Sequence, residues 1–308
     1  MTYPYQVLWT LLLLISLASC SQNSLSTEGE RPLFPVHHEE PDWCETGLIA
    51  FRDRGIVEVT ESGAYISAPG LSGLWLLDPE SGERERVLEF GRHPSWVPGA
   101  DTIAFEHERS IWLLDVTSRG VWPVITGSSD FQPDGGAGGR VLWHRSTGED
   151  RGVWVAGLDG SRESPVLAYS AEPHWHPTGT GFVCQSWDEG GDRCIVSYSM
   201  ATQRKTVLYS GEGRWLSSPR YSPDGRTIAF CHQAAGQRAE IWLMDSSGSG
   251  SRVLTDGGGT SPAWSPSGDR IVYVRERPDD PCDGSGVLWI VDVSTGQQTQ
   301  LTSKWEVE

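Results

Sequence analysis

Short apolar runs recur along the chain, and most of them carry a tryptophan at the second position. Six such runs can be aligned, the fourth with Ile195 in place of the tryptophan: LWLLD (74–78), IWLLD (111–115), VWVAG (153–157), CIVSY (194–198), IWLMD (241–245) and LWIVD (288–292). Counted from the tryptophan or its replacement, successive runs are 37, 42, 41, 47 and 47 residues apart. A repeat of this length indicates one supersecondary unit copied six times.

Each complete unit has the same internal order. An aromatic residue precedes a turn, a β-rich strand follows, and then come a polar loop, the tryptophan strand and a last short strand such as RVLT (252–255). The turn is clearest in SPDG (222–225), where proline presets φ and glycine accepts the left-handed conformation. Four strands in about 43 residues leave no room for a helix. The aromatic residues before the turn are Trp96, Phe131, Trp175, Tyr221 and Trp264.

Four-stranded sheets repeated radially are the blades of a β-propeller, in which each blade buries its face against its neighbour. The sequence therefore predicts an all-β fold, a six-bladed β-propeller of four-stranded blades. We expect the repeated tryptophan to fill the core between blades; the alternative is a ligand-binding aromatic box. The first unit offers one strand too many, so we expect residues 47–51 to pair with the last blade and close the ring.

The wording of the repeat, as in RYSPDGRTIAF (220–230) followed by IWLMD (241–245), resembles the TolB-type, WD-like propeller repeat. The same repeat occurs in the propeller domains of prolyl oligopeptidase-type peptidases. The resemblance covers residues 45–308 and implies the fold more strongly than any function. TolB proper carries an additional N-terminal domain, where this sequence has a short tether. The G-x-S-x-G string of the peptidases is not found.

The N-terminus predicts export. Residues 7–18 form an apolar run, VLWTLLLLISLA, which is too short to cross a bilayer and has the length of a secretory signal core. The string LASC (17–20) resembles the lipobox of bacterial lipoproteins, which implies that Cys20 is acylated. The alternative is an ordinary cleaved signal. We predict a signal peptide over residues 1–19, Cys20 with a polar tether over 20–44, and the propeller over 45–308.

The net charge of −17, without any run rich in lysine or arginine, makes nucleic acid an unfavourable partner.

In an exported protein the five cysteines after Cys20 allow two disulfides. Cys184 and Cys194 flank a hairpin loop and are expected to form one. A Cys44–Cys282 bridge would join the first and last blades. Cys231 follows a strand and is expected to be buried.

Candidate binding residues emerge when the units are aligned. The position before the aromatic is expected to line the central channel, and it holds Ser95, Asp130, His174, Arg220 and Ala263. An acid, a histidine and an arginine would then converge at one mouth, either to bind a ligand or to pair with one another. His174 and His176 point to one face of a strand, but no third metal ligand accompanies them. No metal or cofactor is expected.

Three functions remain open. The first is a non-enzymatic scaffold of the cell envelope, a monomeric propeller anchored by lipid at Cys20 that binds envelope proteins, preferably through a basic patch on the partner. The second is a hydrolase or lyase acting on carbohydrate or peptide, with Asp130, Glu172, His174 and Arg220 at the channel mouth. The third is a sensor that binds a small anion at Arg220 and His174. The absence of a catalytic motif favours the scaffold.

Overall fold

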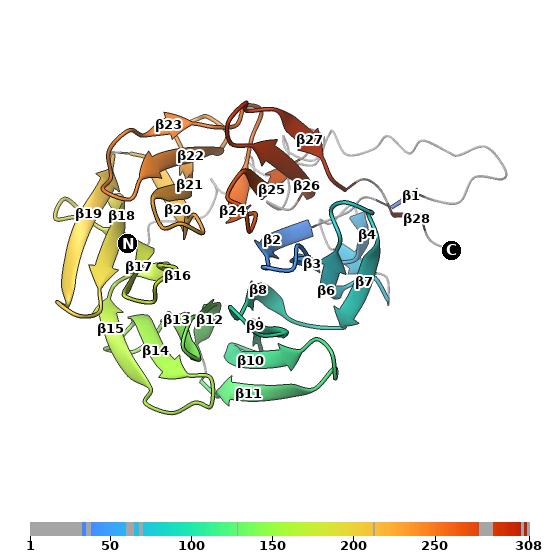
Figure 1. Cartoon of the computed structure of the whole chain (residues 1–308), viewed down its shortest axis with the longest axis horizontal. Coiled ribbons are helices and arrows are strands. Elements are labelled where there is room, and N and C mark those ends of the chain that lie inside the picture. The colour runs from blue at the N-terminus through green and yellow to red at the C-terminus, as the bar shows by residue number, and fades with distance from the viewer. Residues whose placement is uncertain are drawn as a thin grey trace, which may run out of the picture.

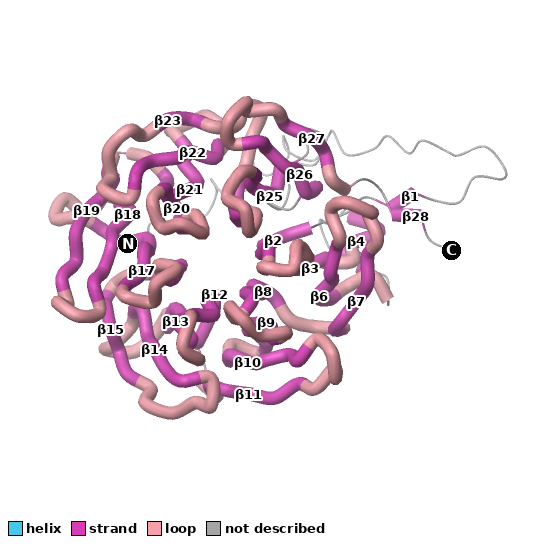
Figure 2. The backbone as a smooth tube through the Cα atoms, viewed as in Figure 1, coloured by secondary structure: helices cyan, strands magenta, loops and turns pink. Residues whose placement is uncertain are grey.

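The computed structural model describes residues 33–34, 38–59, 65–67, 70–127, 129–211, 213–276, 286–302 and 305–306. Within these ranges the chain forms strands and their connections and no helix (Figure 2). None of the described residues therefore belongs to a helix of the length and apolarity needed to cross a membrane.

Six four-stranded antiparallel blades stand in a ring (Figure 1), as the repeat predicts. The first three blades are β2 (His38–Trp43), β3 (Ile49–Asp53), β6 (Gly73–Leu77) and β7 (Arg84–Leu88); β8 (Arg92–Trp96), β9 (Thr102–His107), β10 (Ser110–Asp115) and β11 (Val121–Ile125); and β12 (Asp130–Gly136), β13 (Arg140–Arg145), β14 (Gly152–Gly157) and β15 (Ser164–Ala168). The last three are β16 (Ala171–Trp175), β17 (Gly181–Trp187), β18 (Arg193–Ser199) and β19 (Arg204–Ser210); β20 (Trp215–Tyr221), β21 (Thr227–Gln233), β22 (Glu240–Asp245) and β23 (Arg252–Val253); and β24 (Thr260–Trp264), β25 (Arg270–Glu276), β26 (Gly286–Asp292) and β27 (Gln298–Gln300).

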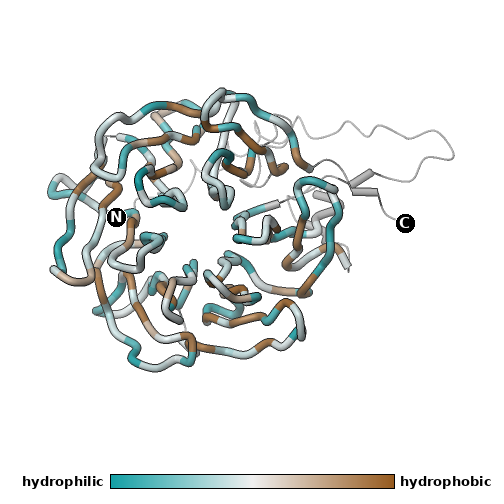
Figure 3. The backbone as a smooth tube through the Cα atoms, viewed as in Figure 1, coloured by the Kyte–Doolittle hydropathy of each residue, from teal (hydrophilic) through white to brown (hydrophobic). Residues whose placement is uncertain are grey.

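The hydrophobic core lies between the blades. Six buried clusters fill the six interfaces, and each combines side chains from two adjacent blades. Hydrophobic stretches follow the strands, while most connections are polar (Figure 3). The repeated tryptophans Trp75, Trp112, Trp154, Trp242 and Trp289 belong to these clusters or pack against them. They fill the core between blades, as expected.

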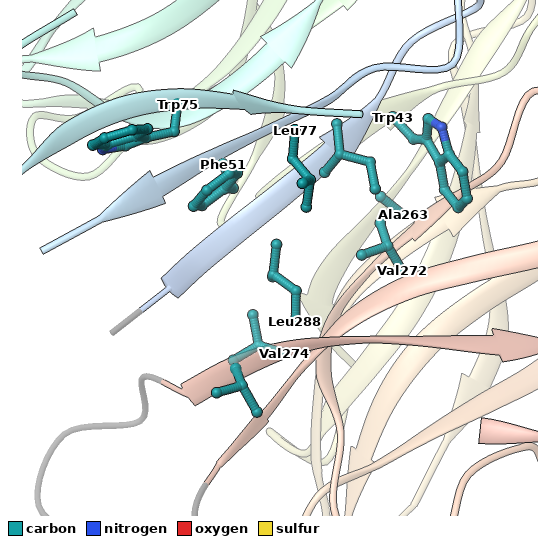
Figure 4. Close-up of a cluster of buried hydrophobic side chains, with 10 residues drawn as sticks. Trp43, Phe51, Trp75, Leu77, Ala263, Val272, Val274 and Leu288 are labelled. Carbon is teal, nitrogen blue, oxygen red and sulfur yellow. The ribbon is translucent and has the colours of Figure 1, made fainter. Parts of the chain in front are cut away.

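The expected closure of the ring by residues 47–51 is wrong. Strand β3 lies between β2 and β6 inside the first blade, because β2, which falls within the predicted tether, supplies the innermost strand. Among the described strands, blades one and six therefore exchange none. They meet in a cluster that includes Trp43, Phe51 and Leu288 (Figure 4), and in a single bridge between His38 and Gly286.

The predicted boundary at residue 45 is consequently too late, since the first blade already begins at His38.

Two further pairs of described strands lie outside the blades. β4 (Ile56–Val59) and β5 (Tyr65–Ser67) form a hairpin inserted between β3 and β6, which accounts for the additional strand in the first unit. β1 (Leu33–Phe34) pairs with β28 (Trp305–Glu306), so the segments before the first blade and after the last blade lie side by side.

All six innermost strands share one irregularity. The residue before a proline has a positive φ, between 49° and 55°, and the strand pairing shifts register there. Such a bulge bends the strand and turns its next side chains toward a new direction. The six residues are Glu40, His93, Gln132, Glu172, Ser218 and Ser261. We call the face where the innermost strands begin the entry face, and the face where they end the cavity face.

The cysteines do not form the expected disulfides. Cys184 and Cys194 are buried thiols on adjacent strands. Cys184 lies opposite Val196 and Cys194 opposite Ser186, so the two thiols are diagonal neighbours rather than a directly facing pair. Cys44 is also a thiol, which hydrogen-bonds with Thr46, while Cys282 lies outside the described residues. Cys231 is buried, as predicted.

Candidate functional site: the cavity-face mouth of the channel

A cavity of about 450 Å³ opens on the cavity face, and all six blades line it. Each blade contributes two residues at equivalent positions to its wall: one channel residue on the innermost strand and the residue that follows it. The channel residues are Asp42, Ser95, Asp134, His174, Arg220 and Ala263, and the residues that follow are Trp43, Trp96, Gly135, Trp175, Tyr221 and Trp264. The mouth is therefore polar at its centre and aromatic around it.

The channel residues of blades one to four also join each blade to the next. In each case the side chain accepts a hydrogen bond from the backbone N–H of the residue after the neighbouring channel residue. Asp42 accepts from Trp96 (2.7 Å) and Asp134 from Trp175 (2.7 Å). The remaining two bonds run from Gly135 to the Ser95 hydroxyl (3.1 Å) and from Tyr221 to Nδ1 of His174 (3.2 Å).

Burial shifts the pKa values of the titratable channel residues. It raises the pKa of Asp134 to about 7 and that of Asp42 to about 6, although the Arg220 guanidinium and the backbone N–H groups act in the opposite direction. Burial also lowers the pKa of His174 well below its ordinary value, and the positive charge of Arg220 lowers it further. Because Nδ1 accepts a hydrogen bond, His174 is a neutral imidazole. Near neutral pH the mouth thus holds carboxyl groups that are poised to gain or lose a proton.

Arg220 divides the channel. It lines the large cavity and also a smaller one of about 150 Å³, which opens on the entry face and is walled by the bulge residues and their prolines. Its guanidinium donates to the carbonyl oxygen of Pro219 (3.2 Å). The side chain acts on the charges of Asp42 and Asp134 through space, since no described ion pair joins it to either carboxylate.

A partly buried ionic cluster lies at the smaller cavity, which Glu40 and His93 line. His93 bridges two carboxylates, with Nε2 2.8 Å from Glu40 and Nδ1 2.9 Å from Glu106. Burial alone would lower its pKa, but the two carboxylates outweigh burial and raise it to about 9. Glu172, which we predicted as a catalytic candidate, accepts hydrogen bonds from the backbone N–H of Ser218 and from Gln132. These contacts join neighbouring blades at the entry face.

Three of the predicted binding residues, Ser95, His174 and Arg220, lie together in the cavity wall, and Ala263 lies with them. Asp130 does not. It is fully buried at the entry-face end of β12, where its carboxylate accepts hydrogen bonds from Trp143 Nε1 (2.9 Å) and from Nε of Arg145 (2.6 Å).

The third blade was misaligned because Pro-Asp-Gly (133–135) has the composition of a turn. In the structure it belongs to the innermost strand, and the turn follows at 137–139. Asp134 is therefore the channel residue. Asp42 is not among the residues that the sequence predicts, because the prediction places EPDW (40–43) in the tether. In all six units a proline stands directly before the channel residue. Aligning the units on this proline identifies both Asp42 and Asp134 as channel residues.

Among the described residues, no group of three or more histidine, cysteine, aspartate and glutamate side chains is arranged to hold a metal ion. His174 and His176 do not share a ligand site: Nδ1 of His176 pairs with the Thr178 hydroxyl (2.8 Å), while Nδ1 of His174 faces Tyr221. Fold and cavity together define a six-bladed β-propeller with one wide, aromatic-lined channel mouth.

A family model described as the TolB beta propeller domain matches residues 92–307. Since this match covers well over half of the sequence, the chain belongs to the TolB β-propeller family. It is also similar to TolB from Acinetobacter baumannii, whose crystal structure matches 75% of this chain and 59% of that one with a TM-score of 0.65 and 21% identity. That likeness concerns the fold.

Two curated relatives have different names. The Tol-Pal system protein TolB of Anaeromyxobacter dehalogenans is 32% identical over 122 residues, which cover 37% of this chain and 27% of the relative. The uncharacterized peptidase YuxL of Bacillus subtilis is 43% identical over 170 residues, covering 43% of this chain and 26% of the relative. The chain thus matches about a quarter of the length of each relative.

Proposed function

We propose that the protein is a non-catalytic binding protein of the bacterial cell envelope, anchored by lipid at Cys20, which holds a segment of a protein partner in the cavity-face mouth. The observation that carries the proposal is the cavity itself. All six blades line it, and five aromatic side chains, each 4 to 9% exposed, present their edges around a polar centre. Aromatic side chains are among the groups that dominate binding energy at protein interfaces. Membership in the TolB family and the relative named for the Tol-Pal system support an envelope partner.

The charge of the mouth indicates the chemistry of the partner. Asp42 and Asp134 lie in the wall, and Glu45 and Asp101 are exposed at its rim, whereas Arg220 is the one lysine or arginine among the lining residues. The partner segment is therefore basic, because electrostatic complementarity speeds the encounter and excludes acidic competitors. Its apolar side chains contact the aromatic residues.

Charge reversal at the rim tests this function. Glu45→Lys with Asp101→Lys alters two exposed side chains that hold no blade together, and in-cell crosslinking compares the variant with wild type. Glu149→Lys with Glu189→Lys is the matched control, since both residues are exposed on the entry face. We expect the rim variant to lose at least about tenfold of the captured partner, as two unfavourable charge pairs imply, and the control to retain it. Equal capture by both variants would refute the proposal.

The alternative function is a propeller enzyme acting on carbohydrate or peptide. It is favoured by the raised pKa of Asp134, about 7, which suits a general acid or base at neutral pH. Against it stands the hydrogen bond by which the same carboxylate holds Trp175 of the next blade. Asp134→Asn preserves an acceptor and removes the proton-transfer group. A hydrolytic or lyase activity that is present in wild type and abolished in this variant, with partner capture unchanged, would favour the enzyme.

A further inference from the structure

The large exposed hydrophobic side chains are distributed unequally between the two faces of the ring. Seven occur in the part of the chain that the structure describes: Phe90, Trp122, Tyr169, Trp187, Val207, Trp215 and Val253. Trp122, Val207 and Val253 lie on the outermost strands β11, β19 and β23. The other four lie on the entry face, and none of the seven lies on the cavity face.

Strand direction establishes this placement. Phe90 and Tyr169 lie in the connections that lead into the innermost strands β8 and β16, and Trp215 is the first residue of the innermost strand β20. Trp187 is the last residue of β17, which runs in the opposite direction and ends at the same face. The four aromatic residues thus extend from the link between blades one and two to the fifth blade.

Guanidinium groups lie on three of these rings. Arg151 lies over Tyr169 (4.6 Å), and Arg193 lies over Trp215 (3.2 Å) and near Trp187 (5.9 Å from its centroid). Tyr169, Trp187 and Trp215 nevertheless keep 40 to 57% of their surface exposed. An exposed aromatic ring beside an arginine offers apolar surface and a phosphate-binding cation at the same depth. Tyrosine and tryptophan favour the boundary between lipid headgroups and hydrocarbon for the same reason.

The chain enters the propeller at this face. β2 begins at His38 on the entry face, and 17 residues separate His38 from Cys20. Even fully extended, they span at most about 60 Å. An acyl chain at Cys20 therefore keeps a bilayer within reach of the entry face. The exposed aromatic residues on that face favour contact with the membrane interface. A single lipid chain binds membranes marginally, and a second contact makes the attachment stable.

We propose that the entry face lies against the lipid bilayer through Tyr169, Trp187 and Trp215, so that the cavity-face mouth points away from the membrane toward its partner. This inference rests on the lipid anchor of the proposed function. Exposed acids on the same face, including Glu149, Asp150 and Glu189, make the contact one with zwitterionic rather than anionic headgroups.

The test compares the full lipidated chain in phosphatidylcholine–phosphatidylethanolamine nanodiscs with the same chain in detergent. Hydrogen exchange is followed at the entry face, in the segments around Tyr169, Trp187 and Trp215, and in the cavity-face turns at 98–100, 177–179 and 223–225. We expect several-fold slower exchange on the entry face alone, and a smaller effect when phosphatidylglycerol is added. Tyr169→Ser, Trp187→Ser and Trp215→Ser together should abolish the protection.

The matched control is Trp122→Ser with Val207→Ser and Val253→Ser, which removes three equally exposed hydrophobic side chains from the outer strands and should leave the protection intact. An acylated chain without entry-face protection overturns this orientation and leaves the anchor standing. Absence of acyl groups on the mature N-terminal peptide, seen by mass spectrometry, overturns both. Protection that depends on protein concentration rather than on lipid would identify a second copy of the chain as the occupant and also overturn the proposal.

Discussion

Asp134 combines two roles that oppose each other energetically. Its carboxylate accepts a hydrogen bond from the Trp175 N–H and so joins the third blade to the fourth, but Asp134 is only 5% exposed and lies near a second acid, the partly buried Asp42. A carboxyl group whose pKa rises to about 7 on folding holds its proton more tightly in the folded state. Stability from this group is therefore greatest below about pH 4, its unfolded value, and decreases as pH rises toward 7.

Asp134→Asn removes the charge and keeps an acceptor oxygen for Trp175. We expect wild type and variant to have nearly equal free energies of unfolding at pH 4, and the variant to be more stable by roughly 4 kcal/mol at pH 8. Urea denaturation at both pH values measures the difference. Asp101→Asn, on the exposed rim of the same cavity, serves as control and should show no such change. A variant less stable than wild type at pH 8 would mean that the ionised carboxylate contributes net stability.

At the scale of the element, the innermost strand is a bulged strand rather than a regular one. Its positive-φ residue is followed by proline in every blade, and the bulge directs the channel residue toward the axis. Non-glycine residues in this left-handed region cost about 1 kcal/mol each. The strain occurs in all six blades, because the same bend positions each of the six channel side chains.

Ser261 isolates this cost, since its hydroxyl forms no hydrogen bond among the described residues while its φ is 51°. Ser261→Gly should stabilise the protein by about 0.5 to 1 kcal/mol, and Ser261→Val should destabilise it by more than about 1 kcal/mol, because a β-branched side chain fits this region poorly. Urea unfolding of both variants measures the effect. If valine were tolerated as well as serine, the bulge would be unstrained.

Local signals predicted the blades but not every register. The recurrent tryptophan and the SPDG-type turn carry enough information for the fold, because each blade must fill the same interface and reverse the chain at the same place. The site depended on a single-residue alignment of the innermost strand. In blade three, Phe131 precedes a turn-like segment and therefore resembles the aromatic position of the other blades. The acidic segment before Trp43 has the composition of a tether, although it belongs to the first innermost strand. Asp134 and Asp42 were lost for these reasons.

At the scale of the whole molecule, the closure of the ring could not be predicted from the pattern, since it depends on contacts between the two ends of the propeller. Among the described residues, blades one and six share one buried cluster, one bridge between strands, and an exposed ion pair between Arg270 and Glu80 (3.1 Å). The Arg270 guanidinium also lies over the Trp43 ring (5.2 Å). Every other pair of neighbouring blades is also joined by a continuous chain. The interface between blades one and six is therefore where the ring opens first, by local unfolding well below the global free energy.

Leu288→Ala tests this weakness, because Leu288 is fully buried in the cluster between blades one and six. Leu142→Ala is the matched control; Leu142 is equally buried, in the cluster between blades three and four. Each substitution should cost about 3 kcal/mol. Hydrogen exchange should nevertheless differ: Leu288→Ala accelerates exchange in blades one and six together and leaves blades three and four protected, whereas Leu142→Ala produces no such selective opening. Uniform acceleration across all six blades in Leu288→Ala would show that the ring unfolds only as a unit, with its closure as strong as any covalently continuous interface.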